Sequence, residues 1–229
     1  MQAFKIFRIP LVIIGDLAKL FLVYMPGSSG FRLRRIYYQK RLKHCGKNLV
    51  VDVGVQMDGL ELISFGDNVH IDKYCVISTG KQLIGEVKTK NNSDYKFSEG
   101  EIFVGSNVHV AQFCILMGYG GIQFGDKVVL SAGSKIYSLT NTAYDSNDRA
   151  KVVSIMPYEF ANFFMCPVVL GQNVWLGLNT IVMPGVVVGK DSFCVSNSLL
   201  MNRFEENSYI SGQPAERISE RFIPASEKV

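Results

Sequence analysis

The stretch GQNVWLGLNTIVMPGVVVGKDSFC, residues 171–194, decides the fold because a six-residue phrase that starts with Gly opens it and returns at its end. The phrase occurs six times, as GKNLVV, GDNVHI, GSNVHV, GDKVVL, GQNVWL and GKDSFC, beginning at Gly46, Gly66, Gly105, Gly125, Gly171 and Gly189. Successive copies start 20, 39, 20, 46 and 18 residues apart. The repeat is therefore regular once two insertions, near residues 80–100 and 138–166, are set aside.

A second hexapeptide follows five of the phrases in register, and its fifth place is always small: Cys75, Cys114, Ser134, Thr180 and Ser198. Apolar residues at every sixth position match neither the 3.6-residue period of a helix nor the alternation of a half-buried strand. They predict an all-β chain in which three short strands make one turn of a left-handed parallel β-helix of triangular section, with Gly at corners that need a positive φ. A sandwich of short strands is the alternative, and six matching phrases disfavour it.

The segments that flank the repeat predict a chain of three parts. Residues 46–212 form the β-helical domain. Residues 1–45 form an N-terminal arm of two short helices, because FKIFRIPLVIIGDLAKLFLVYM and FRLRRIYYQKRLK are separated by the helix-breaking MPGSSG. Residues 213–229 form a C-terminal helix or tail.

Charge is divided unevenly along this chain of 229 residues, whose formal net charge is +4. Residues 1–51 hold ten Lys and Arg and one acid, whereas residues 52–229 hold 14 basic and 19 acidic residues. This distribution excludes a uniformly basic protein that coats nucleic acid, and we expect no nucleic-acid partner. The five cysteines are odd in number and contain no C-x-x-C pair, which favours a reducing cytoplasm and a packing role for Cys75 and Cys114.

The apolar part of the arm, residues 4–25, is interrupted by Lys5, Arg8, Asp16 and Lys19, so it predicts neither a membrane-spanning helix nor a signal peptide. Its apolar residues and the cationic surroundings favour peripheral contact with the inner face of the cytoplasmic membrane. The alternative is a helical cap over the open first coil, and this is the favoured interpretation of residues 31–43.

Three further motifs carry a resemblance to a known family: Trp175-Leu176-Gly177, Met183-Pro184-Gly185 and Gly212-Gln213-Pro214-Ala215. With the repeat, they resemble the hexapeptide-repeat acyltransferases, in particular sugar and surface-polysaccharide O-acetyltransferases of the maltose and galactoside type. The resemblance covers about residues 46–222. It implies a homotrimer that binds acetyl-CoA, as co-substrate, in the cleft between neighbouring β-helices.

The same resemblance implies a set of donor-binding residues. The donor cleft would be lined by Trp175, Gly177, Ser196, Gly212, Pro214 and Ala215, with Arg217 near the phosphates of CoA. Where the relatives have Thr-Lys after the last coils, this chain has Met201-Asn202 followed by Arg203, and Arg203 is a second candidate phosphate ligand.

The catalytic base is harder to assign, because direct acetyl transfer needs a group that takes the acceptor's proton, and the chain has only His44, His70 and His109. Relatives of the maltose type carry the base at the start of the large loop, where this chain has Asn141, an amide that orients a substrate but accepts no proton. His109 is the candidate base or hydrogen-bond donor to the thioester. The alternative is a structural His in a trimer contact.

The large loop offers further candidates. Asp145 and Asp148 would orient an imidazole or bind acceptor hydroxyls, although a loop acid is more often simply solvated. The aromatic residues of the loop would pack on a neighbouring subunit, the favoured interpretation, or form a wall for the acceptor: Tyr158, Phe160, Phe163 and Phe164.

These features together predict a transferase that moves acetyl from acetyl-CoA to a sugar hydroxyl in surface polysaccharide synthesis, such as O-antigen lipopolysaccharide or capsule, by direct attack in a ternary complex. The acceptor would be a sugar or a lipid-linked saccharide. The alternatives are N-acetylation of an amino sugar linked to a nucleotide or lipid carrier, and a non-catalytic trimeric scaffold. Metal-dependent hydration, as in the carbonic anhydrases of this fold, needs three His per zinc, and we expect no metal.

Overall fold

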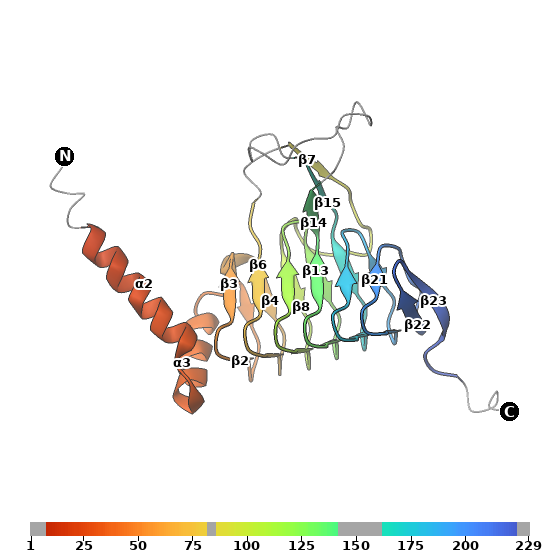
Figure 1. Ribbon diagram of the computed structural model, residues 1–229. Helices are drawn as coiled ribbons and strands as arrows, with labels where there is room; N and C mark the ends of the chain where they lie inside the picture. The colour runs from red at the N-terminus through yellow and green to blue at the C-terminus, as the bar shows by residue number, and fades with distance from the viewer. Residues whose placement is uncertain (1–7, 82–85, 142–161, 224–229) are drawn as a thin grey trace.

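The computed structural model describes residues 8–81, 86–141 and 162–223, and the chain winds through three parallel sheets that form the sides of a prism (Figure 1). Each coil passes from sheet A to sheet B to sheet C, and each strand pairs with its equivalent in the next coil. The expected β-helix is confirmed. We name the corners by the sheets that they join: A–B, B–C and C–A.

Sheet A has the order β1 (His44–Cys45), β4 (Ile63–Phe65), β8 (Ile102–Val104), β11 (Ile122–Phe124), β16 (Val168–Leu170) and β19 (Val187–Val188). Sheet B has the order β2 (Val50–Val51), β5 (His70–Ile71), β9 (His109–Val110), β12 (Val129–Leu130), β17 (Trp175–Leu176), β20 (Phe193–Cys194), β22 (Ser208–Gly212) and β23 (Ala215–Glu220). Sheet C contains β3 (Gln56–Asp58), β6 (Val76–Ser78), β10 (Ile115–Met117), β13 (Lys135–Tyr137), β18 (Ile181–Val182) and β21 (Leu199–Leu200).

The interior of the prism is filled as the repeat predicts. Apolar side chains of the strands fill the interior, and the small residue at the fifth place is buried beside them. Ser134, Thr180 and Ser198 each donate a hydroxyl hydrogen at 2.7–2.8 Å to the carbonyl three residues earlier in the same corner. Cys75 and Cys114 are fully buried in the same column with free thiols, so their predicted packing role is confirmed.

The glycines of the phrase serve a different purpose from the one expected. A Cβ on Gly46 would lie 2.5 Å from the backbone of Gly66, so Gly is needed because successive coils stack too closely for a side chain. The positive φ falls two residues later, where Asn48, Asn68 and Asn107 have φ of 57–59°. Asn tolerates this conformation better than most residues. Their amides also bond to one another along the A–B corner at 3.0 Å.

Both insertions leave the prism at the C–A corner. They form a separate three-stranded sheet, β14 (Leu139–Asn141), β15 (Asn162–Met165) and β7 (Glu86–Thr89), which rises above the coils in Figure 1. β15 is antiparallel to β14 and parallel to β7. A short 3-10 helix, Leu60–Leu62, occupies the same corner in the first coil.

The arm forms two helices, α2 (Arg8–Tyr24) and α3 (Gly27–Gln39), and α3 covers the first coil. The fully buried Arg34 ties the parts together: its Nε donates to the carbonyl of Val51 at 2.8 Å and its Nη1 to the carbonyl of Met25 at 2.7 Å. Desolvation lowers the pKa of this guanidinium, and the charge of Asp52 opposes the shift. α3 therefore packs on the first coil, as the capping interpretation of residues 31–43 expects.

α2 extends away from the prism (Figure 1) and leaves large apolar side chains exposed: Ile13, Ile14, Leu17, Leu20, Phe21 and Tyr24. Within the described ranges, no helix has the length and apolar character needed to cross a membrane.

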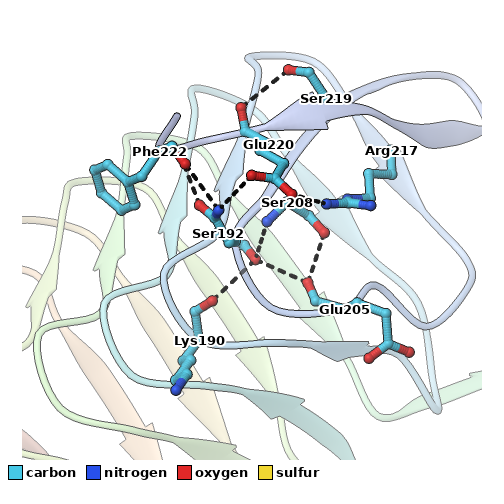
Figure 2. Close-up of polar contacts among 9 residues, drawn as sticks. Lys190, Ser192, Glu205, Ser208, Arg217, Ser219, Glu220 and Phe222 are labelled. Atoms are coloured by element: carbon cyan, nitrogen blue, oxygen red, sulfur yellow. Dashed lines mark hydrogen bonds and ion pairs between the residues drawn. The ribbon is translucent and has the colours of Figure 1, made fainter. Parts of the chain in front are cut away.

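The predicted C-terminal helix is wrong, because Ala215–Glu220 is the strand β23, antiparallel to β22. The last coil leaves an unpaired strand edge, and β23 supplies hydrogen-bonding partners for it. Figure 2 shows the hydrogen bonds that hold β22 on the preceding coil. The backbone N–H of Ser208 donates to Oγ of Ser192 at 3.0 Å, and Oγ of Ser208 donates to the carbonyl of Glu205 at 2.7 Å.

Candidate active site

The outer face of sheet B carries a column of imidazole and aromatic side chains. Strand register aligns His70, His109, Val129, Trp175, Phe193 and Tyr209 on successive coils. Successive residues of a strand point to opposite faces, so the next residue of each strand is buried in the prism. The prediction that His70 and His109 point outward is confirmed, because their side chains are 48% and 46% exposed.

A carboxylate joins the two histidines. Oδ2 of Asp72 lies 3.0 Å from Nε2 of His109, and Oδ1 of Asp72 lies 3.2 Å from Nε2 of His70. Because an ionised carboxylate only accepts hydrogen bonds, the hydrogen bond to Asp72 requires the tautomer of His109 that carries a hydrogen on Nε2. In the neutral tautomer, Nδ1 of His109 is then the basic nitrogen.

Asp72 was not among the residues predicted from the sequence. It directly follows β5, at the start of the B–C corner, and the coil above has the smaller Ala111 at the same place. The register of the repeat could have identified Asp72 as a site residue. Asp72 lies two positions after His70, and the register places this position beside His109 of the next coil.

Trp175 and Gly177 lie farther along the same face. The indole is 44% exposed, its Nε1 donates to Oγ of Ser131 at 2.9 Å, and its ring meets Phe193 edge-on at 5.3 Å between centroids. A Cβ on Gly177 would lie 2.6 Å from the backbone N of Ser196. Gly177 and Ser196 are therefore in direct contact at the B–C corner.

The C-terminal hairpin, formed by β22 and β23, packs against this corner. Its turn contains Gly212, with φ 112°, and Pro214, and Ala215 is 2% exposed. The amide of Gln213 donates to the carbonyl of Asn197, which follows Ser196. The fold thus brings together five of the predicted donor residues: Gly177, Ser196, Gly212, Pro214 and Ala215.

The two candidate phosphate ligands lie apart. Arg217 is on β23, with a guanidinium 3.5 Å from the carboxylate of Glu220 (Figure 2). Arg203 is at the C–A corner, 2.5 Å from Asp94. That hydrogen bond lowers the pKa of Asp94 and raises the pKa of Arg203. Within one chain, Arg203 belongs to a different site from Ser196 and Gly177.

Arg203 lines a cavity of about 370 Å³ between the coils and the inserted sheet. Its walls include Asp94, Phe164, Cys166 and Gly185. Burial raises the pKa of the Cys166 thiol, which is 4% exposed.

Asn141 and His109 are not neighbours in one chain. Asn141 ends β14 at the C–A corner, opposite Phe163 of β15, whereas His109 is on sheet B. Phe163 is 5% exposed, and Phe164 lines the C–A cavity. Asp145, Asp148, Tyr158 and Phe160 lie outside the described residues.

Among the residues with described positions, no group of three or more His, Cys, Asp or Glu could hold a metal ion. The Asp72 carboxylate is hydrogen-bonded to His109 and lies 3.2 Å from Nε2 of His70.

Sequence relatives of the chain are acyltransferases. It is 28% identical over 179 residues to the dTDP-4-amino-4,6-dideoxy-D-glucose acyltransferase of Escherichia coli, covering 78% of this chain and 82% of that protein. It is also 28% identical over 122 residues to WbbJ of Escherichia coli K12, a putative lipopolysaccharide biosynthesis O-acetyl transferase, covering 53% and 62%. No family model matches the chain.

The fold is shared with AntD, an N-acyltransferase from Bacillus cereus whose structure contains dTDP and 3-hydroxybutyryl-CoA. The two structures agree with a TM-score of 0.62 over 82% of this chain and 88% of AntD, at 22% identity. The repeat, the three-sheeted prism and the sequence relatives agree. In sequence the chain is similar to acyltransferases, and its fold is the left-handed β-helix of the hexapeptide-repeat acyltransferases.

Proposed function

We propose that this protein transfers an acetyl group from acetyl-CoA to a hydroxyl of a sugar during the synthesis of a surface polysaccharide. The observation that carries the proposal is the 3.0 Å contact between Nε2 of His109 and Asp72 on the exposed face of sheet B. Trp175 is exposed on the same face, beside the corner formed by Gly177 and Ser196. The relationship to WbbJ supports a polysaccharide hydroxyl as the acceptor.

We infer a direct transfer in a ternary complex, with His109 as the base. Nδ1 of His109 takes the proton of the acceptor hydroxyl as its oxygen attacks the thioester carbonyl. The imidazolium that forms is stabilised by the Asp72 carboxylate. Collapse of the tetrahedral intermediate breaks the C–S bond, and the thiolate of CoA takes the proton from Nδ1. The products are the sugar acetate and free CoA.

Donor binding is assigned to the B–C corner near the C-terminal hairpin. Gly177 has no side chain there, so a pantetheine arm could approach the backbone closely. Arg217 would meet the phosphates of CoA after exchanging its contact with Glu220. Arg203 would bind phosphate only across a subunit boundary, because it lies at the C–A corner of its own chain.

A homotrimer is part of the proposal, with the C–A corner of one protomer facing sheet B of the next. This arrangement would bring Asn141 of one chain toward His109 of another. Its support is the column formed by the exposed Trp175 and Tyr209 with the half-buried Phe193 between them, an aromatic surface that suits a subunit contact.

The arm adds a peripheral membrane contact on the cytoplasmic side. The exposed apolar side chains of α2 would enter the acyl boundary, and exposed cations of α3 and the following turn, including Arg32, Lys40 and Arg41, would meet anionic headgroups at about 1 kcal/mol per charge. Co-flotation with anionic vesicles tests this contact, and Leu17→Glu should abolish it. Recovery of the full-length protein in the soluble fraction at low salt without detergent would contradict it.

N-acylation of a nucleotide-linked amino sugar is the second candidate. The relative that acts on a dTDP-linked amino sugar matches more of this chain than WbbJ does. The Asp72 carboxylate could also hold an ammonium group of the acceptor. The two products differ chemically, because alkaline hydroxylamine cleaves an acetyl ester and leaves an amide intact.

The test of the proposed function is release of CoA thiol from acetyl-CoA with sugar, nucleotide-sugar and lipid-linked acceptors. We expect His109→Ala to lower kcat by about 10²- to 10⁴-fold and Asn141→Ala to lower turnover less. His44→Ala is the matched control, because His44 is exposed on sheet A. If neither His109→Ala nor Asn141→Ala changes turnover, the active site is elsewhere.

A further inference from the structure

Two aromatic side chains stack on the outside of the B–C corner, next to the His109–Asp72 pair. Tyr74 and Phe113 hold the same place in successive coils, with ring centroids 5.7 Å apart and ring planes 7° from parallel. They are 47% and 58% exposed, so the core does not need them.

Their backbone conformation is unusual for such residues. Tyr74 has φ 58° and Phe113 has φ 62°, in the left-handed region that bulky residues avoid. The other coils have residues suited to this conformation at the same place: Gly54, Gly133, Asn179 and Asn197. Strain of this kind concentrates at functional sites.

The neighbouring coil makes room for the rings. A Cβ on Gly54 would lie 2.3 Å from Cδ1 of Tyr74, so the phenol ring lies directly over the bare backbone of Gly54. The two stacked rings thus form a continuous apolar surface along the corner.

A cavity of about 380 Å³ lies beside this aromatic surface. It is lined by the aromatic residues Tyr74 and Phe113 and by the polar residues Asp52, Asp72, Lys73 and Gln112. Asp72 is the carboxylate that contacts Nε2 of His109 at 3.0 Å, so the cavity adjoins the proposed base. A lining that combines apolar surface with a few polar groups is typical of a site for a small molecule.

We propose that this cavity is the acceptor subsite and that it binds one sugar ring. The C–H face of the ring packs on Tyr74 and Phe113, and its hydroxyls bond to Gln112, Lys73 and Asp52. Two carboxylates against one ammonium give the walls a net negative charge, which selects a neutral or amino sugar ring and keeps a diphosphate outside. The assignment as an acceptor subsite rests on the proposed function.

The test uses the double variant Tyr74→Asn/Phe113→Asn, because Asn is the residue that other coils carry at this place and it accepts a positive φ. With the best acceptor of the thiol-release assay, we expect the acceptor KM to rise by at least about tenfold. The KM for acetyl-CoA and the quenching of Trp175 fluorescence by CoA should stay within twofold. Phe222→Asn is the control, because Phe222 is also a half-exposed aromatic residue and lies beyond the C-terminal hairpin.

A binding measurement separates this subsite from the proposed reaction. Saturation-transfer NMR with methyl glycosides of glucose, galactose, mannose, rhamnose and N-acetylglucosamine should show contact with the wild-type protein and none with the double variant. That result without any thiol release would support a sugar site and overturn the proposed function.

Two outcomes would overturn the inference while leaving the proposed function intact. One is normal acceptor KM and glycoside contact in the double variant. The other is a change of oligomeric state in that variant by size-exclusion chromatography, which would make the aromatic pair a contact between copies of the chain.

Discussion

Replacing Asp72 with Asn would test the role of the carboxylate that joins the two histidines. The amide keeps the size of the side chain, and its oxygen can still accept the hydrogen on Nε2 of His109 across about the same 3.0 Å. The change therefore removes the negative charge and leaves the geometry nearly intact. Since His109 becomes positive only as it takes the acceptor's proton, the lost charge should raise the barrier of the chemical step.

The size of the effect follows from Coulomb's law. Two unit charges about 4 Å apart interact by ~1 kcal/mol in bulk water and ~4 kcal/mol near a protein surface. The side chains of Asp72 and His109 are 23% and 46% exposed, so the pair belongs between these limits. An intermediate value of about 2 kcal/mol corresponds to a fall in kcat of about 30-fold.

The assay is steady-state thiol release with both substrates varied. We expect kcat to fall while the KM for acetyl-CoA stays within twofold, because Asp72 lies away from the Gly177–Ser196 contact. Asp67→Asn is the matched control: Asp67 belongs to the same coil, but its Oδ1 accepts the backbone N–H of Lys47 at the A–B corner. The ¹⁵N spectrum of the His109 ring should also show loss of the Nε2–H tautomer in a fraction of Asp72→Asn molecules.

The reasoning would be refuted if Asp72→Asn retained kcat within threefold of the wild type while His109→Ala lowered it by 10²-fold or more. The base would then act without an orienting carboxylate, and the contact between Asp72 and the two imidazoles would serve only to align the coils.

Three further predictions concern stability and are measured by chemical denaturation. Gly66→Ala should lower the free energy of unfolding by about 2 kcal/mol, since the added Cβ would lie 2.8 Å from the backbone of Gly105; no loss would contradict the stacking argument. Arg34→Met should cost about 3 kcal/mol, because buried carbonyls of the arm and first coil lose their donor, and α2 should then exchange its amide hydrogens faster. Arg203 lowers the pKa of Asp94, so their pair stabilises the fold at neutral pH, and this contribution is lost as the pH falls below the ordinary value of 3.8. Arg203→Gln should remove that acid dependence, and an unchanged pH profile would show that the pair contributes nothing.

Much of the candidate site could be predicted because a coil of constant length converts sequence positions into neighbours. His70, His109, Trp175 and Phe193 share one place of the phrase, and the structure aligns them on sheet B. The same register places Gly177 against Ser196. These contacts need no knowledge of the tertiary structure beyond the repeat.

Other parts of the site depend on distances that the repeat does not encode. The sequence suggests Arg203 as a phosphate ligand and places Asn141 where relatives carry the base. Both residues lie at the C–A corner, where the insertions leave the prism. The C-terminal segment was expected to be helical and is a strand, because the open edge of the last coil offers backbone partners that the segment alone does not reveal.

The sequence by itself determined the β-helix, the outward column of His70 and His109, and the small buried residues, because a six-residue period allows one packing of strands and corners. The register places Asp72 beside His109, 37 residues away, but only the tertiary structure decided that the two side chains form a hydrogen bond. It also decided that two strained aromatic residues stack nearby and that Arg34 is buried under the first coil. The physical reason is that side-chain hydrogen bonds and ring stacking depend on rotamers and on gaps left by neighbours such as Ala111 and Gly54. The repeat therefore determines which backbone segments are adjacent, whereas side-chain packing determines which side chains are in contact.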